Sequence, residues 1–123
     1  MTTDHALEIV RRYHDGWTSR NYQQAIELLA SDLIVEVPIN EYPTKESFAD
    51  ALRNFGELVT EVDLLSQLSA GNEAMLLYDM QVEQLGPLRV VEHFTVAEGK
   101  ITRLRQIHDT APVREWMSAN AEA

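Results

Sequence analysis

The chain of 123 residues contains no cysteine. Without thiols it can form neither disulfides nor thiolate metal sites, which fits a reducing compartment. Long apolar runs are also absent, because the apolar stretch at residues 74–78 spans about five residues and a membrane helix needs about 20. The N-terminus lacks the basic stretch of a signal peptide. We therefore expect a cytoplasmic protein with no membrane-spanning segment.

Basic residues are scarce, since ten lysines and arginines stand against twenty acidic residues and give a formal net charge of −10. Binding to phosphate backbones needs a basic surface, so we expect no nucleic-acid partner. The four histidines lack the spacing of metal ligands, and neither a glycine-rich phosphate loop nor a nucleophile elbow occurs. We therefore expect no metal and no other cofactor.

The length of the chain suits one domain over residues 1–123, large enough for a hydrophobic core of its own. Neither an internal repeat nor a low-complexity linker divides it. Residues 118–123 are expected to form a loose tail after the last ordered segment.

Three helices are expected in the first half of the chain. Residues 3–18 place their apolar side chains on one helical face. Asn21 is suited to cap a second helix, whose apolar stripe runs over residues 22–29. Thr44 is suited to cap a third helix that carries Phe48 and Phe55 on one face.

Strand patterns dominate the rest of the chain. A short β-branched strand is expected at residues 33–37, and four longer strands follow at 57–69, 73–83, 87–97 and 101–109. Residues 113–117 are compatible with a short helical turn. Helices followed by a run of strands favour an α+β fold with a mostly antiparallel sheet. Because long strands twist and curl, we expect a cone-shaped curved antiparallel β-sheet wrapped around about three N-terminal helices and enclosing a pocket.

Several local sequences, in their order along nearly the whole chain, resemble the nuclear transport factor 2-like superfamily, which includes ketosteroid isomerases and SnoaL-like polyketide cyclases. The segments that carry the resemblance are residues 12–13, 34–38, 45–55, 98–101 and 106–112. It implies a cone-shaped fold with a deep apolar pocket, often dimeric through the sheet. It implies no single activity, because this fold carries isomerases, cyclases, dehydratases, epoxide hydrolases and plain binding proteins.

The resemblance assigns Tyr13 to the tyrosine that steroid isomerases carry on their first helix. Tyr13 lies on the apolar stripe, so its hydroxyl could point into the pocket and donate to a developing enolate. The alternative is a core tyrosine bonded to a backbone carbonyl.

Glu92 matches the acid of the next-to-last strand in these isomerases. Val90 and Phe94 share its face at period two, so Glu92 is an acid on an otherwise apolar face. Burial there should raise its pKa and give a neutral donor or a tuned acid/base group. The alternatives are a carboxylate paired with Arg105 on the adjacent strand and an acid on the convex face.

His108 on the last strand is the third candidate catalytic residue. It lies diagonal to Glu92 if the strand pair contains a one-residue bulge, whereas without a bulge Ile107 faces inward and His108 outward. A Glu–His pair could share a proton or orient a water molecule. The alternative is a histidine at the rim.

Val37 is a departure from the isomerase pattern, because it stands where those enzymes have their catalytic aspartate. Valine cannot take a proton, so we do not expect steroid isomerisation by that route. The neighbouring Glu36 lies on the opposite face of the strand. The epoxide-hydrolase branch fits poorly as well, since no expected strand carries its Arg-x-Asp pattern.

Three further polar residues lie outside this candidate set. Asp79 is expected to face outward, and His93 lies on the face opposite Glu92. His14 lies at the edge of the first helix's apolar stripe, beside Trp17, where it could look into the mouth of the pocket.

We expect a small hydrophobic molecule as the ligand and a homodimer through the sheet. The favoured function is general acid/base chemistry on a small apolar carbonyl compound, as in an isomerase, cyclase or dehydratase, with Glu92, Tyr13 and His108 as catalytic residues. The alternatives are a non-catalytic binding pocket and an assembly module. The side chains expected to bind the ligand are Trp17, Val37, Phe48, Phe55, Met75, Tyr78, Phe94 and Gln106.

Overall fold

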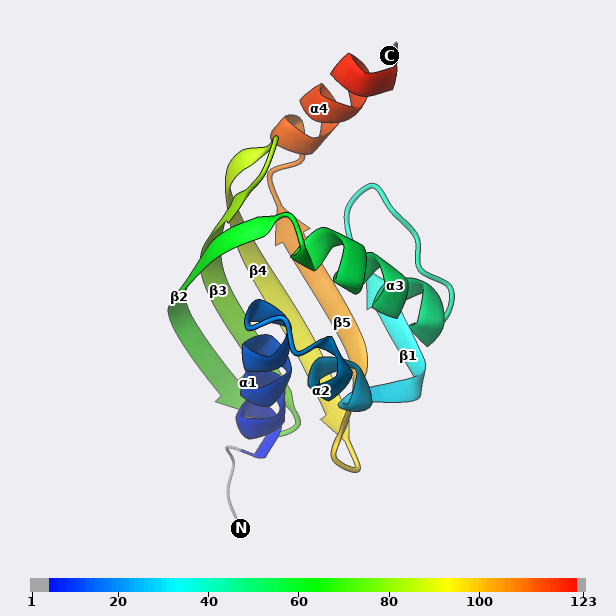
Figure 1. Ribbon diagram of the computed structural model, residues 1–123. Helices are drawn as coiled ribbons and strands as arrows, with labels where there is room; N and C mark the ends of the chain where they lie inside the picture. The colour runs from blue at the N-terminus through cyan, green and yellow to red at the C-terminus, as the bar shows by residue number, and fades with distance from the viewer. Residues whose placement is uncertain (1–4, 122–123) are drawn as a thin grey trace.

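The structure, a computed structural model, describes residues 5–121, which form four helices and five strands. None of the helices in this range is long and apolar enough to cross a membrane. The elements in chain order are α1 (His5–Thr18), α2 (Tyr22–Glu27), β1 (Leu29–Glu36), α3 (Lys45–Gly56), β2 (Val59–Ala70), β3 (Glu73–Val82), β4 (Gly86–Ala97), β5 (Lys100–His108) and α4 (Ala111–Ala121) (Figure 1).

The strands form one curved sheet in the order β1-β5-β4-β3-β2. Strands β2 to β5 pair antiparallel with their neighbours in the chain, which confirms the expected α+β fold. At the edge, β1 pairs parallel with β5. Helix α3 belongs to the long connection between β1 and β2, so the first strand lies far from the second in the sheet.

Helices α1, α2 and α3 lie on one side of the sheet, which is its concave side (Figure 1). Strands β3 and β4 alternate buried and more exposed residues, as strands with one covered face do. Helix α1 packs its apolar stripe against β2 and β3, and α3 packs against β1. The main hydrophobic core therefore lies between these helices and the concave face.

The expected helix caps are present. The Asn21 side chain accepts a hydrogen bond from the Gln24 amide at 3.4 Å at the start of α2. At the start of α3, Thr44 Oγ1 accepts from the Ser47 amide and Ser47 Oγ accepts from the Thr44 amide, both at 3.1 Å. Such reciprocal caps satisfy amides that the helix itself leaves without a partner.

Strand β1 begins earlier than expected. Helical periodicity predicts Leu29 in the stripe of the second helix, but that helix ends at Glu27 and Leu29 is the first residue of β1. The physical reason is pairing with β5, since the Ile101 amide donates to the Leu28 carbonyl at 2.8 Å and Leu29 lies opposite Ile101. This partner is distant in the sequence, so helical periodicity did not reveal it.

The C-terminal segment also differs from the expectation. A turn at 113–117 and a loose tail at 118–123 were expected, whereas residues 111–121 form α4, so the tail is wrong for 118–121. Asp109 Oδ1 accepts from the Ala111 amide at 3.0 Å, and a proline in the first turn suits a helix start. Residues 122–123 lie outside the described residues, as do residues 3–4 of the expected first helix.

Candidate functional site

A cavity of about 380 Å³, here called the main cavity, lies between the concave face of the sheet, α3 and α4. Its floor is formed by deeply buried side chains, among them Tyr13, Tyr78 and Glu92. Exposed apolar side chains that line the cavity mark its rim, and these are Ile39, Leu58, Trp116 and Met117. The walls are mainly apolar and aromatic, which is typical of sites for small molecules.

Glu92 lies on the floor, with 2% of its surface exposed. Its Oε1 accepts a hydrogen bond from the Tyr78 hydroxyl at 3.0 Å, and its Oε2 accepts from Gln106 Nε2 at 3.1 Å. Gln106 lies directly opposite Glu92 on β5, and Tyr78 lies diagonally across on β3. The sheet register therefore holds the carboxyl group between two neutral donors from its two neighbouring strands.

The protonation of Glu92 is balanced near neutral pH. Burial raises its pKa from 4.5 to about 7, because the charged form loses its hydration. The hydrogen bonds from Tyr78 and Gln106 favour the charged form and offset only part of this rise. A carboxyl group with such a pKa can both take and give a proton at neutral pH.

Tyr13 is buried and lines the main cavity, as expected. Burial and the charge of Glu92 raise its pKa well above the usual value, so its hydroxyl keeps its proton at neutral pH. Within residues 5–121, the Tyr13 side chain makes no hydrogen bond. Its hydroxyl is therefore available as a donor to a molecule in the cavity.

His108 faces the main cavity because the β4–β5 pair contains an irregularity between Thr95 and Val96. This is the bulge on which its direction depended, and Ile107, 69% exposed, lies on the opposite face. The contact of His108 is with the backbone, since its Nδ1 lies 2.9 Å from the carbonyl oxygen of Asp109. The side chains that donate to Glu92 are Tyr78 and Gln106. His108 thus shares a wall with Glu92 without a hydrogen bond to it.

Most residues of the expected ligand-binding set line the main cavity. Those that do are Trp17, Val37, Phe48, Phe55, Tyr78 and Gln106. Two do not. Met75 lies opposite His93 on the convex face and is 41% exposed, since it is out of phase with Tyr78 on β3. Phe94 has the expected face, but it is covered by α1, where its ring lies 5.8 Å from that of Tyr13.

Sequence reasoning missed two parts of the cavity wall. One is α4, which supplies Val113, Trp116 and Met117; the indole nitrogen of Trp116 donates to Gln84 Oε1 at 2.7 Å. The available signal is Trp116, a large aromatic residue near the chain end, in the segment that was expected to form only a short turn. The role of Tyr78 as a donor to Glu92 was missed as well, although its diagonal position follows from the period of the strands.

The other missed part is the loop between β1 and α3. Ile39 lines the rim with a backbone φ of 74°, and the Asn40 amide donates to the Pro38 carbonyl at 2.8 Å. A positive φ is costly for a β-branched residue, so this turn stores strain at the rim of the cavity. Nothing in the local sequence marks this position for a positive φ.

The polar residues of the convex face form ion pairs with each other. Asp79 accepts from Arg89 at 2.6 and 2.8 Å, so it faces outward as expected. Arg105 pairs with Glu36 at 3.2 Å. The alternative in which Arg105 neutralises Glu92 is therefore wrong.

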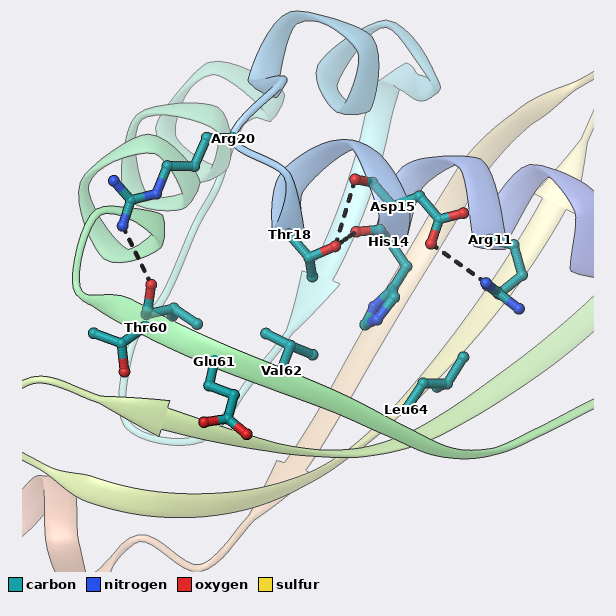
Figure 2. A pocket seen from close by; sticks show the side chains of 10 residues that line it. Arg11, His14, Asp15, Thr18, Arg20, Thr60, Glu61, Val62 and Leu64 are labelled. Atoms are coloured by element: carbon teal, nitrogen blue, oxygen red, sulfur yellow. Dashed lines mark hydrogen bonds and ion pairs between the residues drawn. The ribbon is translucent and has the colours of Figure 1, made fainter.

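A second hollow of about 370 Å³, here called the polar hollow, lies between α1 and β2 (Figure 2). His14 lines this hollow, and it is absent from the wall of the main cavity, into whose mouth it was expected to look. Its ring lies 5.0 Å from that of Tyr78 and 5.8 Å from that of Trp17, so it packs against two side chains that line the main cavity without lining the cavity itself.

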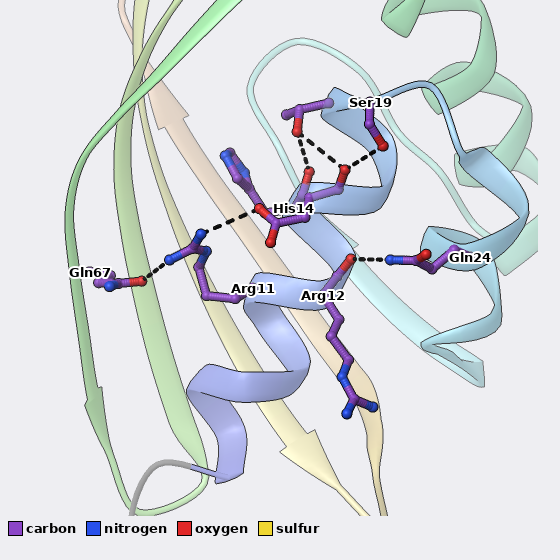
Figure 3. Close-up of polar contacts among 8 residues, drawn as sticks. Arg11, Arg12, His14, Ser19, Gln24 and Gln67 are labelled. Carbon is purple, nitrogen blue, oxygen red and sulfur yellow. Dashed lines mark hydrogen bonds and ion pairs between the residues drawn. The ribbon is translucent and has the colours of Figure 1, made fainter.

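His14 is neutral at neutral pH, because burial lowers its pKa to about 4. Its Nδ1 is buried and has no hydrogen-bond partner in the part of the chain that the structure describes. The neighbouring Arg11 is engaged elsewhere, since its guanidinium donates to Gln67 Oε1 at 2.7 Å and to Asp15 Oδ1 at 3.4 Å (Figure 3). The polar hollow thus holds a neutral histidine beside the charged side chains of Arg11 and Asp15.

The profile of the SnoaL-like domain matches residues 10–104. The chain belongs to the SnoaL-like domain family. No curated protein sequence matches this SnoaL-like domain significantly.

Solved structures agree with this membership. A protein from Kribbella flavida is 27% identical, with a TM-score of 0.88 over 98% of this chain and 99% of that chain. A protein from Cytophaga hutchinsonii described as NTF2-like is 16% identical, with a TM-score of 0.79 over 89% and 94% of the two chains. An LEH-like epoxide hydrolase from M. tuberculosis is 19% identical, with a TM-score of 0.75 over 98% and 95%. The SnoaL-like domain therefore has the fold of the nuclear transport factor 2-like superfamily, as its sequence indicated.

Proposed function

We propose that this SnoaL-like protein binds a small apolar carbonyl compound in the main cavity and acts on it by general acid/base chemistry, as an isomerase, cyclase or dehydratase. The observation that carries the proposal is a buried carboxyl group, Glu92, whose pKa of about 7 lets it exchange a proton inside an apolar cavity. Membership of the family and the aromatic walls support a small-molecule ligand.

In the proposed step, ionised Glu92 takes a proton from a carbon atom next to the carbonyl group. The electron pair of the broken C–H bond becomes part of an enolate, and negative charge develops on the carbonyl oxygen. Tyr13 donates a hydrogen bond to that oxygen, in a site where low polarity strengthens such bonds. Protonated Glu92 then returns the proton to another atom of the ligand, while His108 on the same wall orients the ligand or a water molecule.

Two routes known from the superfamily are not part of this proposal. Val37 lines the main cavity where the resembled isomerases have an aspartate, so no second carboxyl group stands there to move the proton. The Arg-x-Asp pattern of the epoxide hydrolases is absent from the whole sequence. Glu92 would therefore serve both as the base and as the acid.

Deuterium exchange tests the chemistry without knowledge of the natural substrate. We expect the protein to accelerate exchange at the α-carbon of 1-tetralone in D₂O, as followed by NMR, and Glu92→Gln to abolish the acceleration. Glu115→Gln, which removes a carboxylate from the exposed side of α4, is the matched control and should keep it. Equal exchange by the wild type and by Glu92→Gln would contradict the role of Glu92.

The second candidate function is a non-catalytic binding protein for a small hydrophobic molecule. The observation that favours it is the isolation of Glu92, which bonds to two neutral donors, Tyr78 and Gln106, and to neither Tyr13 nor His108. Native mass spectrometry of the purified protein would then show a copurified apolar ligand, and no ketone would exchange faster than in buffer.

We also propose that the protein is a cytoplasmic homodimer that associates through the convex face of the sheet. This face exposes apolar side chains among its ion pairs, including Leu68 at 67%, Met75 at 41% and Ile107 at 69%. Leu68 and Met75 lie opposite each other on β2 and β3, so they form a continuous patch. Light scattering should give the mass of a dimer, and Ile107→Lys should shift it toward the monomer; a monomeric wild type at micromolar concentration would contradict the proposal.

A further inference from the structure

The structure assigns a ligand class to the main cavity: apolar amines, with the ammonium group paired to Glu92 on the floor and the apolar part against the aromatic walls. This inference rests on the binding role proposed above and not on turnover. It follows from three observations, namely the charges that line the cavity, the unused hydrogen-bonding capacity of Glu92 and the rings around it.

The main cavity has an acid on its floor and no strong base. In the part of the chain that the structure describes, no lysine, arginine or aspartate lines it. The other titratable side chains that line the cavity are Tyr13 from α1, Tyr42 from the loop before α3, Tyr78 from β3 and His108 from β5, and α3 and α4 contribute none to the wall. Since the chain as a whole carries a net charge of −10, its field also favours a cation over an anion.

The carboxylate of Glu92 is incompletely compensated. Tyr78 and Gln106 give it one hydrogen bond each, whereas an ionised carboxylate has about four lone-pair positions. Neither donor carries a charge, so the ionised group is buried without a counter-charge. An ammonium group in the cavity supplies both the missing charge and further N–H donors, in the charge-assisted form that makes the strongest hydrogen bonds.

The surroundings of Glu92 suit a cation with an apolar body. The ring of Tyr78, whose hydroxyl holds Glu92, lies 6.2 Å from the ring of Trp17, and both line the cavity. Electron-rich ring faces attract cations, and tryptophan does so most strongly. Phe48 and Phe55 extend this aromatic wall toward α3, where the apolar part of the ligand can pack. A volume of about 380 Å³ accommodates a molecule with one ring and a short chain.

Three probes of matched shape test the inference: 4-phenylbutylamine, 4-phenylbutanol and 4-phenylbutyrate, measured by isothermal titration calorimetry between pH 5 and pH 8. An alkylamine stays protonated throughout, whereas Glu92 becomes ionised around pH 7. We therefore expect the affinity for the amine to rise about 100-fold between pH 5 and pH 8. The alcohol should change little, and at pH 8 the amine should bind at least tenfold more tightly than the alcohol and the butyrate.

Matched variants locate the effect. Glu92→Gln should remove the pH dependence of amine binding, while Glu115→Gln removes the same charge from exposed α4 and should retain it. His108→Gln should also retain it, because the ammonium pairs with Glu92. If the rise with pH instead persists in Glu92→Gln or disappears in His108→Gln, the pairing with Glu92 is wrong.

The outcome for ligand class is separable from that for chemistry. Equal affinity for the amine and the alcohol at pH 8 overturns this inference, even if Glu92-dependent exchange of 1-tetralone supports the proposed reaction. Tight, pH-dependent amine binding without any ketone exchange supports the inference and the binding role, and it counts against turnover. If the protein both binds the amine and accelerates the exchange of 1-tetralone, 4-phenylbutylamine should inhibit that exchange competitively, since the amine and the ketone occupy one cavity.

Discussion

Glu92→Gln should make the protein more stable at pH 8 than the wild type, by an amount that falls below about 1 kcal/mol at pH 5. Burial raises the pKa of Glu92 from 4.5, the value of an exposed glutamate, to about 7 in the folded state. Each unit of difference between the folded and unfolded pKa values corresponds to about 1.4 kcal/mol of folding free energy. The buried carboxylate therefore costs the folded protein about 3 kcal/mol at pH 8 relative to the same group in the unfolded chain.

The sign follows from the order in which the two states lose the proton. As pH rises from 4.5 to about 7, the unfolded chain releases the proton of this group while the folded protein still holds it. The contribution of Glu92 to the free energy of unfolding is thus complete below pH 4.5 and falls until about pH 7. Glutamine at this position has no proton to release. Its amide oxygen can still accept the hydrogen bond from the Tyr78 hydroxyl.

Urea unfolding followed by tryptophan fluorescence, at pH 5 and at pH 8, measures this difference for the wild type, Glu92→Gln and Glu115→Gln. The wild type should lose about 2–3 kcal/mol more than Glu92→Gln between the two pH values, and Glu115→Gln should follow the wild type. The titration of His14 contributes equally to all three proteins and cancels. The same wild-type-to-Glu92→Gln difference at both pH values would refute the reasoning and place Glu92 in contact with water or a counter-charge.

Three other substitutions test separate features. His14 is buried with a pKa near 4, so its own contribution to stability should fall by about 3 kcal/mol as pH drops from 6.5 to 4. Because the opposite contribution of Glu92 is common to the wild type and His14→Phe, the stability difference between these two proteins in urea unfolding should change by that amount, and a constant difference would contradict the burial of a neutral His14. Ile39→Gly should raise the thermal midpoint by relieving a φ of 74°, a gain of about 1 kcal/mol after the entropy of glycine; a lower midpoint would mean that packing of Ile39 outweighs the strain. A Cβ on Gly56 would overlap the Tyr22 hydroxyl, so Gly56→Ala should displace Tyr22 and cost about 1 kcal/mol in urea unfolding, and an unchanged midpoint would show that Tyr22 moves freely.

Much of the fold was predictable because its signals are local. The stripe of α1, the caps Asn21 and Thr44, and the order of helices before strands can all be recognised within about ten residues of sequence. The errors occurred where a distant partner outweighed a local pattern. Leu29 continues a helical stripe, yet it pairs with Ile101 on β5. Residues 118–121 are a different case, because they are helical in a segment whose weak hydrophobic patterning does not mark a helix.

The candidate site was predictable to the level of faces. Period two on β4 placed Glu92 on the apolar face, and that face is the one that the helices cover. The same period of two places Met75 on the convex face with His93, so its assignment to the ligand-binding set is wrong. Phe94 could not be placed in the same way, because whether a concave residue meets the cavity or a helix depends on where α1 packs.

The sequence by itself determined that the chain has an acid on an apolar strand face, a tyrosine on an apolar helix face, and a valine where the resembled isomerases have their base. The tertiary structure alone decided which groups meet. The irregularity at Thr95 and Val96 turned His108 inward, and the sheet register gave Glu92 the partners Tyr78 and Gln106 in place of Tyr13 and His108. The physical reason is that the direction of a side chain follows from its own strand, whereas its partners follow from hydrogen bonds between strands, and a shift of one residue changes every pair beyond it.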